Sequence, residues 1–392
     1  MEHSRVRNDA VLPDDDFAQW VQDNSNCTPL RNTAKSFVVT LNVVREVSLD
    51  DELALVSIIL VTHNGSAVIE GSLRSLKNLE WPKLEIIVVD NASTDDTLDR
   101  VSRSLPTARI IAVRQNRGYG AGGNRGASVA RGNILLFMNQ DVALSSQFLK
   151  GIVSMMSRDE SIGVCGGAVL SWDGTMLVSI GQIFERWTGY GFDVGFGSSQ
   201  LDLKRQVSEV FSPNGSAFAI KRNLFREIGG FNEDLFMYFD ETDLSWRARI
   251  AGFRVVCSRN SVVRHMITQR RAHEARLRYY VDRNSLLSAA RNYEFSSLIL
   301  FLPTSFATRL VGMIALAILG RQEHALSTAR AMNDFIVSLP KLWRERRASP
   351  RIRRVSDREV MRKEVLASPK DILRVFSSSL MPYTSSEAHS SR

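Results

Sequence analysis

Four short apolar runs, separated by helix-like stretches, constrain the fold of this 392-residue chain more than any other feature. Each run is continuous and rich in β-branched residues, as in strands buried on both faces of a parallel sheet. The runs are residues 56–63, 84–90, 108–113 and 133–141. The stretches between them predict helices over 67–79, 94–105 and 122–131. This alternation predicts an α/β fold with an open, mostly parallel sheet.

Polar side chains stand at the carboxyl ends of all four predicted strands. They are Thr62, Asn64, Asp90, Asn116, Asn139 and Asp141. Ligands of open α/β sheets bind outside these ends, so the residues mark a candidate binding site. Carboxylate and carbonyl oxygens beside a diphosphate also suit Mg²⁺ or Mn²⁺.

A glycine-rich loop follows the third predicted strand. Residues 118–123 (GYGAGG) match the G-x-G-x-x-G pattern of dinucleotide sites, and Asp141 follows 18 residues after Gly123. The loop follows the third strand rather than the first, and the pattern leaves Asp90 without a role, which argues against a nicotinamide or flavin enzyme. A tight strand-to-helix turn is the alternative, and it is compatible with a phosphate at the helix N-terminus.

An acidic cluster opens a predicted helix at residues 240–251, after the aromatic residues of the segment 236–239. Acids in a first helical turn favour the helix dipole, which is a purely structural role. Acids beside aromatic residues also suit a general base, because burial raises the pKa of a carboxyl toward its working range. His265 lies 24 residues beyond Glu241. A lone histidine is more often structural, but one that returns to such a site is a candidate metal ligand.

The most apolar stretch is 298–319, which Pro303 and Arg309 interrupt. A spanning helix needs about 20 apolar residues with few charges. The stretch therefore favours an interfacial membrane segment, with a buried core helix and a true span as alternatives. Residues 341–364 carry ten Lys/Arg against four Asp/Glu, which favours an anionic membrane surface. That stretch has one aromatic residue, Trp343, and no nucleic-acid motif, so we expect no nucleic-acid partner.

The rest of the composition limits the class and location of the protein. Three widely spaced cysteines, an odd number, argue against a disulfide framework and a cysteine zinc site. Residues 1–52, with ten acids and five bases, predict a poorly structured leader that lacks the apolar region of a secretory signal. We therefore expect a cytoplasmic protein, attached peripherally to the cytoplasmic face of the membrane.

Six segments in order resemble the inverting family 2 glycosyltransferases of the GT-A fold, especially their rhamnosyltransferase-like branch. The segments are VSIILVTHN, VVDNASTDDT, NRGYGAGGNRGA, FMNQD, residues 213–252 and YYVDRN. The resemblance covers about residues 56–290 and implies a Rossmann-like GT-A domain over 53–290. It leaves 291–364 as a helical, membrane-associating region and 365–392 as a flexible tail.

The resemblance also implies where the donor nucleotide and a divalent metal, Mg²⁺ or Mn²⁺, would bind. Residues 139–141 match the DxD motif of the family, with asparagine in place of the first acid. Asp141 and His265 are the implied metal ligands. The implied nucleotide-sugar-binding residues are Thr62, Asn64, Asp90, Asn116, Gly118, Asn124, Asn139 and Asp141.

The implied residues for chemistry lie further along the chain. Asn214, Gly215 and Ser216 resemble the segment that lines the donor sugar and the acceptor. Asp240 and Glu241 occupy the Glu-Asp motif with the two acids exchanged, so Glu241 is the expected general base and Asp240 the fallback. Residues 283–284 belong either to the site or to helix packing.

The implied reaction is the transfer of a sugar, a deoxyhexose such as rhamnose, from a nucleoside-diphosphate donor with inversion at the anomeric carbon. The expected acceptor is a hydroxyl of a lipid-linked or cell-envelope glycan. The departure in the DxD motif keeps one alternative open, a non-catalytic binding or scaffold protein with the same fold.

Overall fold

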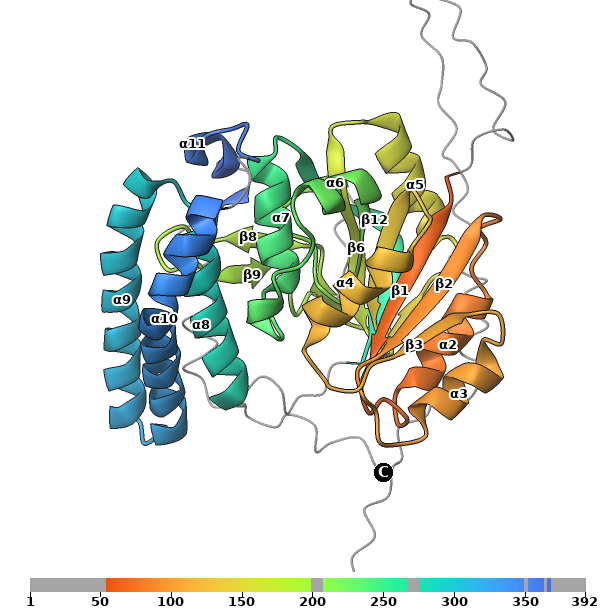
Figure 1. Ribbon diagram of the computed structural model, residues 1–392, viewed down its shortest axis with the longest axis horizontal. Helices are drawn as coiled ribbons and strands as arrows, with labels where there is room; N and C mark the ends of the chain where they lie inside the picture. The colour runs from red at the N-terminus through yellow and green to blue at the C-terminus, as the bar shows by residue number, and fades with distance from the viewer. Residues whose placement is uncertain (1–53, 199–206, 267–274, 349–351, 363–364, 368–392) are drawn as a thin grey trace, which may run out of the picture.

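A central twisted sheet organises the computed structural model, which describes residues 54–198, 207–266, 275–348, 352–362 and 365–367 (Figure 1). The strand order is β10-β12-β6-β11-β4-β1-β2-β3. In that order the strands span Val207–Glu209, Arg254–His265, Ile162–Ser171, Ala217–Lys221, Ile134–Asn139, Val56–Thr62, Leu84–Asp90 and Arg109–Ala112.

The four apolar runs form the adjacent strands β4, β1, β2 and β3, which are mutually parallel. β11 lies antiparallel between β4 and β6, and β12 runs parallel to β6. Two short strands extend this sheet, β5 (Val142–Leu144) beside β12 and β7 (Leu177–Ser179) beside β6. A separate hairpin joins β8 (Gln182–Phe184) to β9 (Gly191–Asp193). The predicted open, mostly parallel sheet is therefore confirmed.

Helices cover both faces of this sheet, and each face has its own apolar core. The helices on one face are α2 (Ile69–Lys77), α3 (Thr97–Ser104) and α5 (Phe148–Arg158). The other face carries α4 (Tyr119–Val129), α6 (Arg222–Glu227) and α7 (Asp240–Ile250), and the short 3₁₀ turn η1 (Glu233–Leu235) precedes α7. Parallel strands covered on both faces bury both sets of side chains, which explains their continuous apolar sequence.

The predicted helix 122–131 starts earlier than expected, at Tyr119, because Gly118 adopts a φ of 93° that ends the preceding loop. The glycines within this helix allow it to pack closely onto the sheet. A Cβ at Gly122 would lie 2.7 Å from Val61 Cγ1, and one at Gly126 would lie 2.4 Å from Ile59 Cγ2. The glycine run therefore allows close contact between helix and sheet. This agrees with its interpretation as a tight strand-to-helix turn.

Three long helices form the other end of the molecule in Figure 1: α8 (Ala275–Asn292), α9 (Phe295–Ile318) and α10 (Gln322–Ala348). A third apolar core joins them to α7 through Trp246, Phe301 and Phe335. The short helix α11 (Asp357–Val360) follows and contacts α7. The predicted boundary at residue 290 thus falls inside α8.

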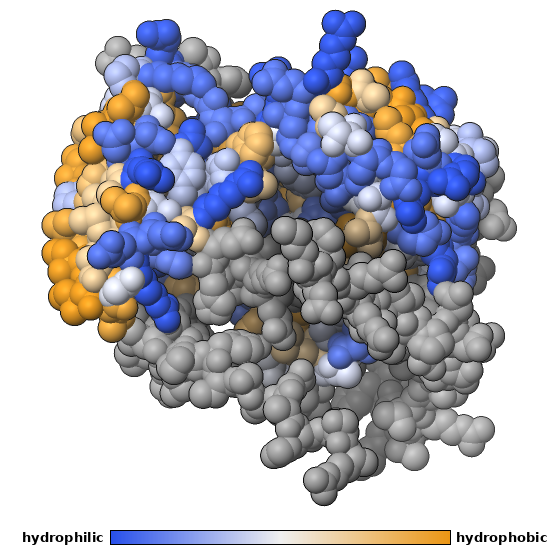
Figure 2. Space-filling model, turned by 90° about the horizontal axis from the view of Figure 1, so that it is seen from below, coloured by the Kyte–Doolittle hydropathy of each residue, from blue (hydrophilic) through white to orange (hydrophobic). Residues whose placement is uncertain are grey.

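The apolar stretch 298–319 forms α9, and most of it faces outward. Within the described residues, α9 is the one helix long and apolar enough to cross a membrane, and its most apolar window is 22% buried. This exposure rules out the buried core helix. Figure 2 shows apolar side chains gathered along the edge where α9 lies. Its large exposed apolar residues are Phe295, Ile299, Leu300, Leu310, Val311, Ile314 and Ile318.

Part of the basic stretch 341–364 is used within the fold. Arg346 donates to the carbonyls of Ala290 and Arg291, and Arg353 pairs with Asp357 at 3.1 Å. The tail expected to be flexible from residue 365 begins with packed residues, since Val365 is buried in the third core. The predicted leader and residues 368–392 lie outside the described residues.

Candidate active site

Parallel pairing of β1 and β2 brings the first two predicted site residues together. Thr62 and Asp90 are register partners, and both are buried. The Thr62 hydroxyl donates to Asp90 Oδ1 at 3.0 Å, and the Ser93 amide donates to Asp90 Oδ2 at 3.0 Å. The carboxylate therefore fixes the loop that follows β2 at the carboxyl edge of the sheet.

The asparagines of this edge also shape loops. Asn64 has a φ of 46°, and its Oδ1 accepts from the Thr94 amide at 2.8 Å. Asn116 Oδ1 accepts from the Gly118 amide at 2.9 Å. Nucleotide binding by Asn64 and Asn116 stays a prediction, and their hydrogen bonds shape the loops between which the nucleotide would bind.

The glycine loop, Gly118–Gly123, is fastened to the segment before α7. A Cβ at Gly118 would lie 2.1 Å from the Phe236 carbonyl oxygen, which accepts from the Tyr119 amide at 2.8 Å. The side-chain amide of Asn124 accepts from the Phe231 amide at 2.8 Å and donates to its carbonyl at 3.0 Å. The predicted residues Gly118 and Asn124 thus hold the loop against the chain that leads to the predicted base.

The turn between β4 and β5 brings together the two predicted metal ligands. β12 pairs His265 with Val142, and His265 Nε2 lies 3.4 Å from Asp141 Oδ1. Nε2 is buried and has no hydrogen-bond partner among the described residues.

A carboxylate and an imidazole fit a divalent cation. No group of three or more Asp, Glu, His or Cys side chains in the described residues is arranged to hold a metal. Mg²⁺ is commonly held by one or two carboxylates together with substrate phosphates, so two side-chain ligands are compatible with such a site. The metal role of Asp141 and His265 stays a prediction.

The loop 214–216 connects the end of β4 to the predicted base. The Asn139 amide donates to the Ser216 carbonyl at 2.9 Å, and the Ser216 amide donates to Asn214 Oδ1 at 3.0 Å. A Cβ at Gly215 would lie 2.8 Å from Glu241 Oε2. Glycine at 215 therefore leaves room for the carboxylate of Glu241.

Asp240 and Glu241 open α7, as the acidic cluster predicts. Asp240 Oδ1 is buried, has no hydrogen-bond partner among the described residues, and would lie 2.9 Å from a Cβ at Gly120. Burial raises the pKa of Asp240 well above its usual range. Burial, aided by the charge of Asp193, raises the pKa of Glu241 to about 7. A carboxyl with a pKa near neutrality is matched to general-base catalysis.

The structure adds two residues that the sequence patterns did not single out. The Tyr119 hydroxyl is buried without a hydrogen-bond partner among the described residues, and burial and the charge of Asp240 raise its pKa. Asp193, on the β8–β9 hairpin, accepts from Asn214 Nδ2 at 3.3 Å. The glycine motif that contains Tyr119 could have pointed to this residue. Asp193 lies among glycine-rich turns, and no motif in the sequence points to it.

This fold and this site define a class. The mostly parallel sheet with helices on both faces is the fold that the resemblance to GT-A glycosyltransferases predicts. Residues 57–229 match the model of the family described as glycosyl transferase family 2. This part of the chain is therefore a family 2 glycosyltransferase domain.

Individual relatives are similar at low identity. The N-acetylglucosaminyl-diphospho-decaprenol L-rhamnosyltransferase of Mycobacterium tuberculosis is 23% identical over 233 residues, which cover 53% of this chain and 75% of that protein. The uncharacterized protein y4gI of Sinorhizobium fredii is 28% identical over 279 residues, 64% of this chain and 30% of that protein. The chain thus spans less than a third of the length of y4gI.

Among solved structures, GalNAc-T7 with UDP, GalNAc and Mn²⁺ aligns with a TM-score of 0.51. The two sequences are 16% identical, and the alignment covers 63% of this chain and 49% of GalNAc-T7. At this identity the likeness supports the predicted GT-A fold.

Proposed function

We propose that this protein is an inverting glycosyltransferase that moves a sugar from a nucleoside-diphosphate donor to an acceptor hydroxyl. One observation carries the proposal: the carboxylate of Glu241, with a pKa of about 7, lies against the loop 214–216. That loop is hydrogen-bonded to Asn139, two residues before Asp141. The predicted base and the predicted donor site therefore share one wall.

Glu241 would accept the proton of the acceptor hydroxyl as that oxygen attacks the anomeric carbon of the donor. Attack from the face opposite the leaving diphosphate is a single displacement, so it inverts the anomeric configuration. General-base catalysis contributes about 10²–10⁴-fold to such a step. Asp240, beside Glu241, is the fallback base.

Asp141 and His265 would hold a divalent cation, Mg²⁺ or Mn²⁺. When bound, the cation offsets the negative charge that develops on the leaving diphosphate. The fit rests on their 3.4 Å approach and on the buried Nε2 of His265. GalNAc-T7, which shares the fold, was crystallised with Mn²⁺.

For the donor we propose a deoxyhexose such as rhamnose, and for the acceptor a lipid-linked or cell-envelope glycan. The support is the similarity to the M. tuberculosis rhamnosyltransferase, whose name gives a sugar attached to diphospho-decaprenol as its acceptor. A lipid-linked acceptor requires the enzyme to work at a membrane.

We also propose that α9 binds the cytoplasmic face of a membrane peripherally. The helix buries Ser305 and Arg309 against the protein and exposes large apolar side chains such as Val311, Ile314 and Ile318. Arg309 is 1% exposed and donates to the Thr188 carbonyl at 3.0 Å and to Ser285 Oγ at 2.6 Å. The single charged residue of α9 is thus bound within the protein. The neighbouring helix α10 carries the exposed Arg330, and a charge beside the apolar face suits an interfacial helix better than a spanning one.

A donor screen tests the proposed activity. Purified protein is heated with dTDP-, UDP- or GDP-sugars in Mn²⁺ or in EDTA, and its unfolding temperature is measured. A ligand at 100 times its Kd stabilises by about 2.7 kcal/mol. We expect metal-dependent stabilisation by one donor, followed by release of its nucleoside diphosphate when acceptor is added. Binding without any release, with a range of glycan acceptors, would favour the non-catalytic alternative.

A further inference from the structure

The aromatic turn, Leu235–Phe239, has an unusual backbone. Phe236, Tyr238 and Phe239 have φ values of 66°, 61° and 74°. A non-glycine residue is strained in such a conformation, and the conformation persists only where surrounding groups impose it. The turn leads directly into Asp240 and Glu241, so its shape decides where these carboxyls stand.

Asn284, on α8, is the group that holds this turn. Its Nδ2 donates to the carbonyls of Leu235, Met237 and Tyr238, each at 2.9 Å. Asn284 is completely buried. The two hydrogens of one side-chain amide are therefore shared among three backbone carbonyls of the turn.

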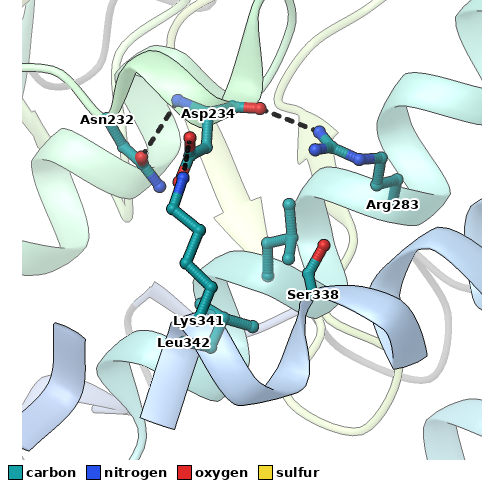
Figure 3. Close-up of a pocket in the computed structure, with 7 residues that line it drawn as sticks. Asn232, Asp234, Arg283, Ser338, Lys341 and Leu342 are labelled. Carbon is teal, nitrogen blue, oxygen red and sulfur yellow. Dashed lines mark hydrogen bonds and ion pairs between the residues drawn. The ribbon is translucent and has the colours of Figure 1, made fainter. Parts of the chain in front are cut away.

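Arg283 fixes the orientation of that amide. Its Nη1 donates to Asn284 Oδ1 at 3.0 Å and to the Asp234 carbonyl at 2.9 Å. Figure 3 shows Arg283 directed at the Asp234 backbone, while Lys341 reaches the Asp234 side chain from α10. Because Oδ1 of Asn284 faces a cation, Nδ2 must face the carbonyls of the turn.

The same turn also holds the glycine loop from its other side. The Phe236 carbonyl accepts from the Tyr119 amide at 2.8 Å, and Gly118 fits against the Phe236 backbone with no room for a Cβ. The aromatic turn is thus fixed between α8 and the glycine loop. A shift of the turn would move the base and the wall of the donor site together.

We propose that Asn284 is a positioning residue that sets the place of Glu241 and of the glycine loop at the same time. This inference rests on the proposed function, since it assigns roles to a base and a donor site. It assigns a role to the last two residues of the YYVDRN segment, for which the sequence left either the site or helix packing open.

The test compares Asn284→Ala with Ser288→Ala. Ser288 lies one turn further along α8, is equally buried, and its hydroxyl has no hydrogen-bond partner among the described residues. Turnover and donor KM are measured by release of nucleoside diphosphate. For Asn284→Ala we expect kcat to fall and donor KM to rise, each by about tenfold or more, with Ser288→Ala unchanged.

The KM separates positioning from simple instability. A loss of folded protein lowers the apparent kcat and leaves the donor KM unchanged, so that pattern would overturn the proposal. Wild-type kcat and KM in Asn284→Ala would overturn it as well. If Asn284→Ala does not fold, Arg283→Ala, which keeps the amide without its orienting partner, replaces it with the same expected directions and the same contradicting results.

Hydrogen exchange keeps the inference separate from the proposed activity. We expect faster amide exchange in peptides that cover 235–241 and 117–122 of Asn284→Ala, and unchanged exchange in Ser288→Ala. This readout needs no turnover. A wild-type protein that releases no nucleoside diphosphate would contradict the proposed function, whereas unchanged exchange in both segments would contradict the positioning role of Asn284.

Discussion

At the scale of single residues, the site is built around carboxyl groups whose neighbours set their state. Burial raises the pKa of Glu241 to about 7 from an ordinary value of 4.5. Asp90 instead accepts hydrogen bonds from Thr62 and Ser93 and fixes a loop. The two carboxyl groups thus differ in their surroundings, since hydrogen-bond donors hold Asp90 whereas desolvation dominates at Glu241.

The raised pKa of Glu241 predicts a pH dependence of stability. The folded state holds this proton more tightly than the unfolded state, so stability falls as the pH rises from about 4.5 to 7 and stays lower above that. Glu241→Gln removes the buried charge, so we expect the variant to exceed the wild type in unfolding free energy by about 1–3 kcal/mol at pH 8. The gain should shrink below pH 5. Urea unfolding at both pH values measures it, and an equal difference at both would contradict the assignment.

Asp141 is one of the two predicted metal ligands, and a single substitution tests its role. We expect Asp141→Ala to lose the Mn²⁺-dependent part of the stabilisation that a nucleotide-sugar donor gives, because the variant keeps only His265 of the predicted pair. Thermal unfolding with donor, in Mn²⁺ and in EDTA, measures the effect. Stabilisation that depends on Mn²⁺ as strongly as in the wild type would exclude Asp141 from the metal site.

Residue roles were only partly predictable from the sequence. The pairing of Thr62 with Asp90 follows from two parallel strands in register, so the patterns located it. The conformation of the aromatic turn did not follow, because no local preference places Phe236, Tyr238 and Phe239 at positive φ. Asn284 imposes it from 46 to 49 residues away, and such distant contacts have no signature in a single sequence.

At the scale of elements, periodicity predicted the strands well and the outer helix less well. β2 coincides with its apolar run and β1 ends one residue before the end of its run, because strands buried on both faces favour continuous apolar sequence. The run 133–141 instead ends at Asn139, and a turn over residues 140–141 leads to β5. For α9 the apolar sequence left burial undecided, and the burial of Leu298, Phe301 and Arg309 shows which side faces the protein.

The exposed side of α9 predicts membrane binding. Val311, Ile314 and Ile318 are 66%, 51% and 80% exposed. Replacing all three with serine removes apolar surface that lipid would cover, so we expect at least about tenfold weaker binding to vesicles. Sedimentation with vesicles that contain anionic lipid measures it.

A control variant for that experiment is Arg103→Ser on α3, at the opposite end of the molecule in Figure 1. It should sediment like the wild type. Unchanged sedimentation of the triple variant would contradict membrane binding by α9. A dimer that dissociates in the triple variant, without any lipid effect, would assign the face to a second copy of the chain instead.

At the scale of the whole molecule, the domain and the helical region form one structure. Trp246 of α7 packs in the same apolar core as Phe301 of α9 and Phe335 of α10. α8 connects the two parts, since Asp282 faces Thr328 of α10 at 2.7 Å while Asn284 holds the turn before the base. The proposed membrane-binding face and the proposed active site are therefore connected through α8 and this apolar core.

The central claim is that Glu241 is the base of a nucleotide-sugar transferase, and its conservative variant tests it most directly. The measurement is nucleoside-diphosphate release by Glu241→Gln, beside donor affinity from thermal unfolding. Glu160→Gln, an exposed residue just before β6, is the matched control. We predict turnover reduced by about 10²–10⁴-fold with donor affinity nearly unchanged. Turnover of Glu241→Gln close to that of the wild type would contradict the account.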